Sequence, residues 1–207
     1  ERGMTMTEFV GGAGALVSVA TTYGVVALAE VGDKSQLVCM TLASRHRSWP
    51  VLLGAIPAFA LLNLIAVLFG SVAAEWVPSH VLALGVGVLF AVFGIQALRA
   101  GAEEEDVDVR EPAALHSIAL VTFSMIFMAE FGDKTQLAVA GLGSAATPLG
   151  VWLGATAALA TTSALGVWVG GSLLQRLPVV WIHRVAGLLF LVLAAAAFWT
   201  ALSGFYD

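Results

Sequence analysis

The sequence predicts an all-α membrane protein with six transmembrane helices arranged as two inverted three-helix repeats. Two observations lead to this fold class. Hydrophobic residues make up 59% of the 207 residues and charged residues only 11%, whereas a soluble domain is roughly one quarter charged. The second half of the chain also repeats the first at an offset of 100 residues, which indicates an internal duplication.

The hydrophobic residues gather in six segments, each long enough to cross a bilayer as a helix of about 20 residues. The first segment is too long for one straight span, so we expect a tilt, a kink or an exposed end to absorb the excess length. Gly32 and its equivalent Gly132 suit such a kink. Prolines lie in or beside the breaks between segments. The segments cover residues 9–44, 50–74, 80–100, 114–144, 149–173 and 180–203.

Matching residues extend the duplication well beyond one motif, with Gly54 matching Gly154 and Phe90 matching Phe190. Three spans per copy is an odd number, so the second copy must enter the membrane from the opposite side. Inverted repeats of this kind are frequent in secondary transporters, whose substrate sites lie near the midplane where the repeats meet. The expected units are a first repeat at 4–100, an acidic linker at 101–113 and a second repeat at 114–207.

Arginines in the connecting loops predict the orientation. The side that holds the loops after the first, third and fifth spans carries six of them. The opposite side has only Arg2, which precedes Met4 and is expected to be left over from expression. Positive residues favour the cytoplasm, so we expect both termini outside and the 101–113 linker inside a plasma or inner membrane. The six are Arg45, Arg47, Arg99, Arg110, Arg176 and Arg184.

The motif "AEVGDKSQL" at 29–37 recurs as "AEFGDKTQL" at 129–137, and both lie inside apolar segments. Helical rise places Glu30 about 22 Å from Arg45, and therefore near the middle of a hydrocarbon core about 30 Å thick. A charge at that depth costs several kcal/mol unless it is paired or hydrated. Inverted symmetry would bring both copies together at the midplane. The charged residues are Glu30, Asp33, Glu130 and Asp133, with Lys34 and Lys134 as counter-charges.

These six charges sum to −2, which one divalent cation or two protons would neutralise. Clustered carboxylates hold protons until a cation displaces them. Together with nearby hydroxyl and amide groups they form an all-oxygen shell that suits Ca²⁺ or Mn²⁺. Soft ligands are scarce, since Cys39 is alone and His46, His80, His116 and His183 lie at loop edges. The further candidate ligands are Ser35, Thr135, Gln36 and Gln136.

Two structural alternatives stay open at this point. Asp33 with Lys134, and Asp133 with Lys34, could be static ion pairs that join the repeats. The equivalent residues Asn63 and Ser163 could line the ion pathway, or they could only form hydrogen bonds between helices.

The doubled Glu-x-Gly-Asp-Lys-Ser/Thr motif resembles the signature of Uncharacterised Protein Family 0016, the transmembrane protein 165-like cation/proton exchangers. Both copies match at every defined position, Glu30 to Ser35 and Glu130 to Thr135. The resemblance covers nearly the whole chain. It implies transport of Mn²⁺ and Ca²⁺, in exchange for protons, and it implies that the acidic motif residues bind the ion.

We therefore expect a secondary transporter that exports Mn²⁺ or Ca²⁺ from the cytoplasm against protons. An exporter of an amino acid or another small cation is the alternative, and a channel or a scaffold held by ion pairs would also accommodate the charges. An enzyme is not expected, because no nucleophile–base set or cofactor loop is present. The composition excludes a basic nucleic-acid-binding face. The expected partners are the ion, protons and the lipid bilayer; a homo-oligomer stays open.

Overall fold

In the computed structural model, residues 6–31, 33–99, 115–174 and 179–204 are described. Every regular element in these ranges is an α-helix, as the sequence predicts. The predicted linker at 101–113 and the residues before Met4 lie outside the described ranges. The helices are α1 (Met6–Glu30), α2 (Lys34–Arg45), α3 (Ser48–Trp76), α4 (Ser79–Arg99), α5 (Leu115–Glu130), α6 (Lys134–Ala145), α7 (Pro148–Leu174) and α8 (Val179–Ser203).

The first and fourth predicted segments are each broken into two helices at the charged motif. The pair formed by α1 and α2 bends by 68°, and α5 and α6 are separated at the equivalent place. Gly132 lies in the second break with a φ of +80°, a backbone conformation that residues with a side chain rarely adopt. The kink expected at Gly132 is therefore confirmed, while Gly32 lies outside the described residues.

Within the described residues, four helices are long and apolar enough to cross a membrane, and the count rises to five if the bent α1–α2 pair forms one span. The segment Ile118–Glu130 of α5 is apolar but shorter than a span. Side chains that face outward on the long helices are large and hydrophobic, such as Trp76 (83% exposed) and Trp199 (76% exposed). Such a surface suits contact with lipid. The prediction of six spans stays a prediction.

Contacts between the two halves are reciprocal. Gly54 of α3 packs against Thr122 of α5, where an added methyl carbon would lie 2.8 Å from the threonine Cβ. With the halves exchanged, Gly154 of α7 packs in the same way against Thr22 of α1, at 3.0 Å. A contact that recurs with its partners exchanged is the mark of a two-fold relation. The duplication in the sequence is therefore accompanied by reciprocal packing between the two halves.

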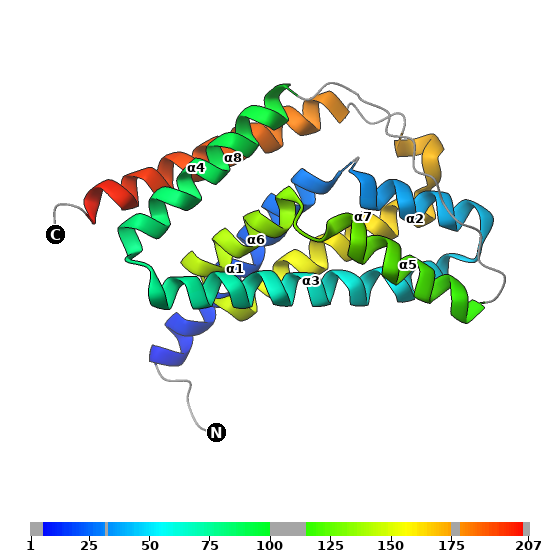
Figure 1. The fold of residues 1–207 in the computed structure, drawn as a ribbon, viewed down its shortest axis with the longest axis horizontal. Coiled ribbons are helices and arrows are strands. Elements are labelled where there is room, and N and C mark those ends of the chain that lie inside the picture. Colours follow the sequence, from blue (N-terminus) through cyan, green and yellow to red (C-terminus); the bar gives the residue numbers. More distant parts are fainter. Residues whose placement is uncertain (1–5, 32, 100–114, 175–178, 205–207) are drawn as a thin grey trace.

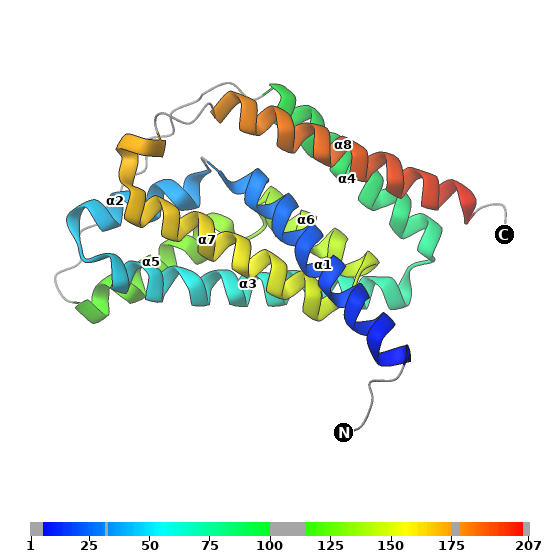
Figure 2. The ribbon, with the colours of Figure 1, turned by 180° about the vertical axis from the view of Figure 1, so that it is seen from behind.

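Helices α4 and α8 lie side by side along one face of the group formed by the other helices (Figures 1 and 2). They run in opposite directions. A methyl carbon added at Gly94 would lie 2.9 Å from the carbonyl oxygen of Gly187, and one added at Gly187 would lie 2.9 Å from that of Gly94. The rings of the equivalent residues Phe90 and Phe190 pack against each other in a tilted arrangement, with centroids 5.8 Å apart. Equivalent residues of the two halves therefore meet along this helix pair.

The close approach of α3 to α5 makes Gly54→Ala a test of the packing between halves. An added methyl group would collide with the Ala119 carbonyl oxygen and with Thr122. We expect a loss of about 1–3 kcal/mol of unfolding free energy, as for overpacked cores. Thermal unfolding of the purified protein measures this loss. Gly85→Ala is the matched control, because nothing lies within 4 Å of that position, and it should be neutral or stabilising. Equal stability of the two variants would contradict the packing.

Candidate ion-binding site

Both motif copies form the same chain reversal between two helices. The backbone N–H of Asp33 donates to the carbonyl oxygen of Glu30 at 3.2 Å, and Asp133 donates to Glu130 at the same distance. Each glutamate thus ends one helix, and each aspartate directly precedes the next. Asp133 is the N-cap residue of α6, yet its side chain makes no capping hydrogen bond. The break therefore places one glutamate and one aspartate at the junction of two helices in each half.

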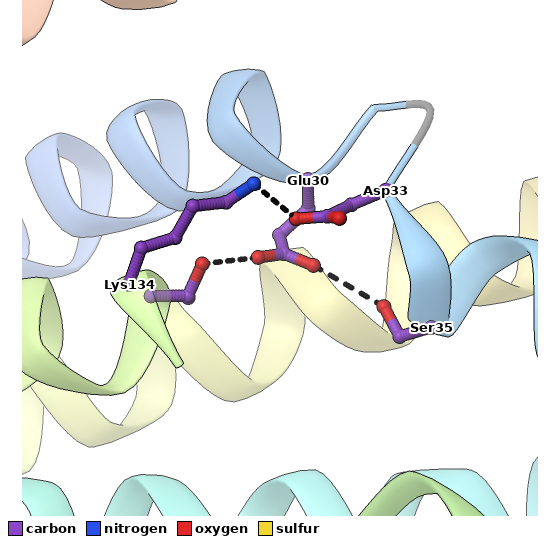
Figure 3. Close-up of polar contacts among 5 residues, drawn as sticks. Glu30, Asp33, Ser35 and Lys134 are labelled. Carbon is purple, nitrogen blue, oxygen red and sulfur yellow. Dashed lines mark hydrogen bonds and ion pairs between the residues drawn. The ribbon is translucent and has the colours of Figure 1, made fainter. Parts of the chain in front are cut away.

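Glu30 is fully buried, and its carboxylate accepts hydrogen bonds from both halves of the molecule (Figure 3). The Ser35 hydroxyl donates to Oε2 at 3.2 Å. The Thr135 hydroxyl, from the second motif copy, donates to Oε1. A buried carboxylate needs such donors, because leaving it unsatisfied in an apolar interior is costly. Three predicted site residues are thereby brought into direct contact.

Lys134 pairs with Asp33 across the two halves, with its Nζ 2.6 Å from Oδ2 (Figure 3). The Asp33 side chain is 11% exposed and that of Lys134 is 43% exposed. This is one of the two ion pairs that the sequence left open as an alternative. The other would involve the side chain of Lys34, which lies outside the described parts of the structure.

Glu130 is 4% exposed and lies near the other motif carboxylates. It interacts electrostatically with Glu30, Asp33 and Asp133. Within the described residues, however, no three acidic, histidine or cysteine side chains are close enough to hold a metal ion together. The structure thus gathers the predicted ligands in one region without forming a complete coordination shell. Their role as ligands stays a prediction.

The two motif glutamines make equivalent bonds to the opposite half. Nε2 of Gln36 donates to the Thr162 carbonyl oxygen at 3.0 Å, and Nε2 of Gln136 donates to the Leu62 carbonyl oxygen at 3.0 Å. Each bond ties a short helix after the break to a long helix of the other repeat. In this conformation the glutamines therefore fix the position of α2 and α6.

Asn63 and Ser163 are both buried between helices, each only 1% exposed. The Asn63 amide donates to the Thr156 hydroxyl at 3.2 Å, which joins α3 to α7. The Asn63 contact is an interhelical hydrogen bond of the kind that the second sequence alternative describes. A role in lining the pathway stays a prediction.

A cavity of about 140 Å³ adjoins the Lys134 side chain. Its walls come mainly from α4 and α8, with Ala29 of α1 and Phe190 among the apolar residues and Gln96 and His183 among the polar ones. The sequence pattern placed His183 at a loop edge and did not single out Gln96. Neither residue has a polar counterpart in the other half, where Ala83 and Ala196 occupy the equivalent positions. Duplication alone could therefore not have revealed them.

The model of the family described as "Divalent cation/proton antiporter GDT1" matches this chain twice, at residues 18–105 and again at 118–205. The chain belongs to the GDT1 family. This is the family that the doubled motif indicated, and it is a family of transporters. The two matches are offset by 100 residues, as is the duplication in the sequence. Family membership and the apolar helices together identify an integral, multi-pass membrane protein.

Relatives in the GDT1 family cover most of the chain. It is 32% identical over 174 residues to the "Putative manganese exporter" of Vibrio cholerae, covering 83% of this chain and 85% of the relative. A GDT1-like protein of Synechocystis is 27% identical, with coverage of 86% and 95%. The chloroplastic PAM71-homolog of Arabidopsis thaliana is 28% identical over 85% of this chain, which spans only 57% of that relative. No solved structure matches the chain.

Proposed function

We propose that this GDT1 family protein exports divalent cations, Mn²⁺ first and Ca²⁺ second, from the cytoplasm in exchange for protons. The observation that carries the proposal is the pairing of the two motif copies around buried carboxylates, with Glu30 bonded to Thr135 and Asp33 bonded to Lys134. Oxygen-rich, anionic groups bind hard divalent cations. The name of the Vibrio cholerae relative supports Mn²⁺ as the substrate.

The proposed site contains Glu30, Asp33, Glu130 and Asp133, with Ser35 and Thr135 as hydroxyl ligands. Gln36 and Gln136 would complete the shell through their amide oxygens after a rearrangement. Their amide nitrogens are engaged with the opposite half, and Oε1 of Gln136 accepts a hydrogen bond from the Gly132 N–H. Lys34 and Lys134 serve as internal counter-charges. In the metal-free state a lysine ammonium group thus forms an ion pair with a site carboxylate. It leaves that carboxylate when the metal ion binds.

Alternating access would arise from two inverted repeats that rock around this site. The reciprocal contacts and the opposite directions of α4 and α8 support this architecture. A two-fold axis that relates two antiparallel helices is perpendicular to the helix axes. If these helices span the membrane, the axis therefore lies in the membrane plane. In this proposal the six spans include α1–α2 and α5–α6 as broken spans, both termini lie outside and the 101–113 linker is cytoplasmic.

Transport in proteoliposomes tests the proposed function. The full chain should move Mn²⁺ saturably, at a rate that depends on an imposed pH gradient and drops when a protonophore collapses that gradient. A channel would show flux without saturation or proton coupling. Transport of a cationic amino acid by a protein that neither binds nor moves Mn²⁺ or Ca²⁺ would contradict the proposal.

The motif charges also predict the stoichiometry of exchange. Their sum of −2 matches either one divalent cation or two protons, so the exchange should be electroneutral. Mn²⁺ flux should then be unchanged when a potassium-diffusion potential is imposed at constant pH gradient. A flux that follows the imposed voltage would contradict this balance, even if Mn²⁺ transport itself is confirmed.

A further inference from the structure

The Asp33–Lys134 pair raises a question about where the lysine goes when a cation binds. Its Nζ lies 2.6 Å from Asp33 Oδ2, so an ion bound to that carboxylate would lie within a few ångströms of the ammonium group. Two unit charges about 4 Å apart interact with about 4 kcal/mol near a protein surface, and a divalent ion doubles this repulsion. Lys134 must therefore leave Asp33 when the proposed substrate binds there.

The 140 Å³ cavity between α4 and α8 offers a destination within reach, because the Lys134 side chain itself forms part of its wall. A water molecule takes about 30 Å³ in the liquid, so the cavity can hold an ammonium group with some water. In the present structure the lysine head is held by Asp33, with Nζ 2.6 Å from Oδ2 (Figure 3). A rotation of the flexible side chain would exchange one position for the other.

Hydrogen-bond acceptors are available in the same cavity. Nδ1 of His183 is buried without a hydrogen-bond partner, and an unprotonated imidazole nitrogen accepts from an ammonium donor. Gln96 lines the same cavity, and a glutamine side chain has a carbonyl oxygen that can serve as a second acceptor. Since buried polar atoms are normally satisfied, an unused acceptor beside a lysine calls for an explanation.

The two halves differ at these positions. Gln96 and His183 line the cavity beside Lys134, whereas the equivalent residues in the other half are Ala196 and Ala83. Lys34 would therefore find no such acceptors at the equivalent place. The duplication has kept the lysine in both motifs but has supplied these acceptors to only one of them.

We propose that the α4–α8 cavity receives the Lys134 ammonium group when a divalent cation occupies Asp33, with Gln96 and His183 as its hydrogen-bond acceptors. The proposal rests on the proposed function, because it needs a cation that displaces the lysine. It assigns Gln96 and His183 as positioning residues that act on the ion through Lys134. It also makes Lys134, and not Lys34, the lysine that moves within this cavity.

The test is a double-mutant cycle on Mn²⁺ affinity, measured by equilibrium binding to the full chain in nanodiscs. The double variant Gln96→Ala/His183→Ala copies the residues of the other half. It should weaken Mn²⁺ binding by about tenfold, because the displaced ammonium loses two acceptors and keeps only water. In a Lys134→Met background the same double change should alter affinity by less than about twofold, since the interacting partner is gone.

Control variants separate this effect from a general disturbance of the helix pair. Ile95→Ala/Val185→Ala changes adjacent, exposed positions on the same two helices and should leave Mn²⁺ affinity unchanged. Gln96→Asn/His183→Gln retains acceptor oxygens and should recover most of the lost affinity. If the double alanine variant does not fold, the single variants Gln96→Ala and His183→Ala carry the same comparison.

Two results would overturn the proposal while leaving the function intact. One is unchanged Mn²⁺ affinity in Gln96→Ala/His183→Ala. The other is an equal loss of affinity with and without Lys134, which would mean that the cavity does not act through the lysine. Absence of Mn²⁺ and Ca²⁺ binding and flux in the wild-type protein would instead refute the proposed function itself, and this inference with it.

Discussion

Glu30→Gln and Glu130→Gln should each reduce pH-driven Mn²⁺ flux by about 100-fold or more, since the number of charged ligands tunes the affinity of such sites over orders of magnitude. Both side chains are buried, at 0% and 4% exposure. The amide is nearly isosteric with the carboxylate but carries neither its negative charge nor an exchangeable acid proton. Each variant thus loses an ion ligand and a proton carrier together.

Initial rates in proteoliposomes with an inward or outward pH gradient measure this loss. Glu75→Gln is a matched control, because it makes the same chemical change at an exposed residue near the end of α3, and it should transport normally. Monodisperse elution and an unchanged melting temperature would show that the motif variants are folded. Normal pH-coupled Mn²⁺ flux in both Glu30→Gln and Glu130→Gln would refute the site assignment.

Lys134→Met should destabilise the metal-free protein and make it more dependent on Mn²⁺. The change leaves the Asp33 carboxylate, 11% exposed, without its ion-pair partner. A loss of about 1–3 kcal/mol is expected, between the values for surface and fully buried pairs, because the lysine side chain is 43% exposed. Mn²⁺ no longer has to displace an ammonium group, so it should bind more tightly and raise the melting temperature by more than in the wild type.

A double-mutant cycle with Asp33→Asn isolates the ion pair from other effects. Asp33→Asn/Lys134→Met should be more stable than the sum of the two single changes implies, because neither charge is then left alone. The double variant should also lose the Mn²⁺-dependent rise in melting temperature. Additive stability effects, or a weaker Mn²⁺ response in Lys134→Met than in the wild type, would contradict the role of Lys134 as an internal counter-charge.

Much of the fold follows from local features of the sequence. Apolar length and proline positions predict the helical segments, since a backbone in lipid must satisfy its own hydrogen bonds. The excess length of the first segment and the glycine in each motif predict a kink, and Gly132 has the positive φ that explains the second break. The offset of 100 residues predicts two related halves, and the packing of Gly54 recurs at Gly154 with the halves exchanged.

The contacts within the site could be predicted only in part. The motif showed that charges of the two halves should meet, but several arrangements of two lysines and four carboxylates satisfy the same charge sum. The structure selects Lys134 with Asp33 and places both Ser35 and Thr135 on Glu30. Gln96 and His183 escaped the sequence pattern because they break the repeat. Their relevance depends on how α4 packs against α8, which no local signal encodes.

A structure of the full chain with Mn²⁺, using the anomalous scattering of the metal, tests most directly whether the two motif copies bind one cation. We expect a single anomalous peak between the carboxylates of Glu30 and Glu130. We also expect Lys134 Nζ to have moved from the 2.6 Å contact with Asp33 that it makes without metal. A peak bound by only one motif copy, or one remote from both, would contradict a shared ion site at the meeting point of the repeats.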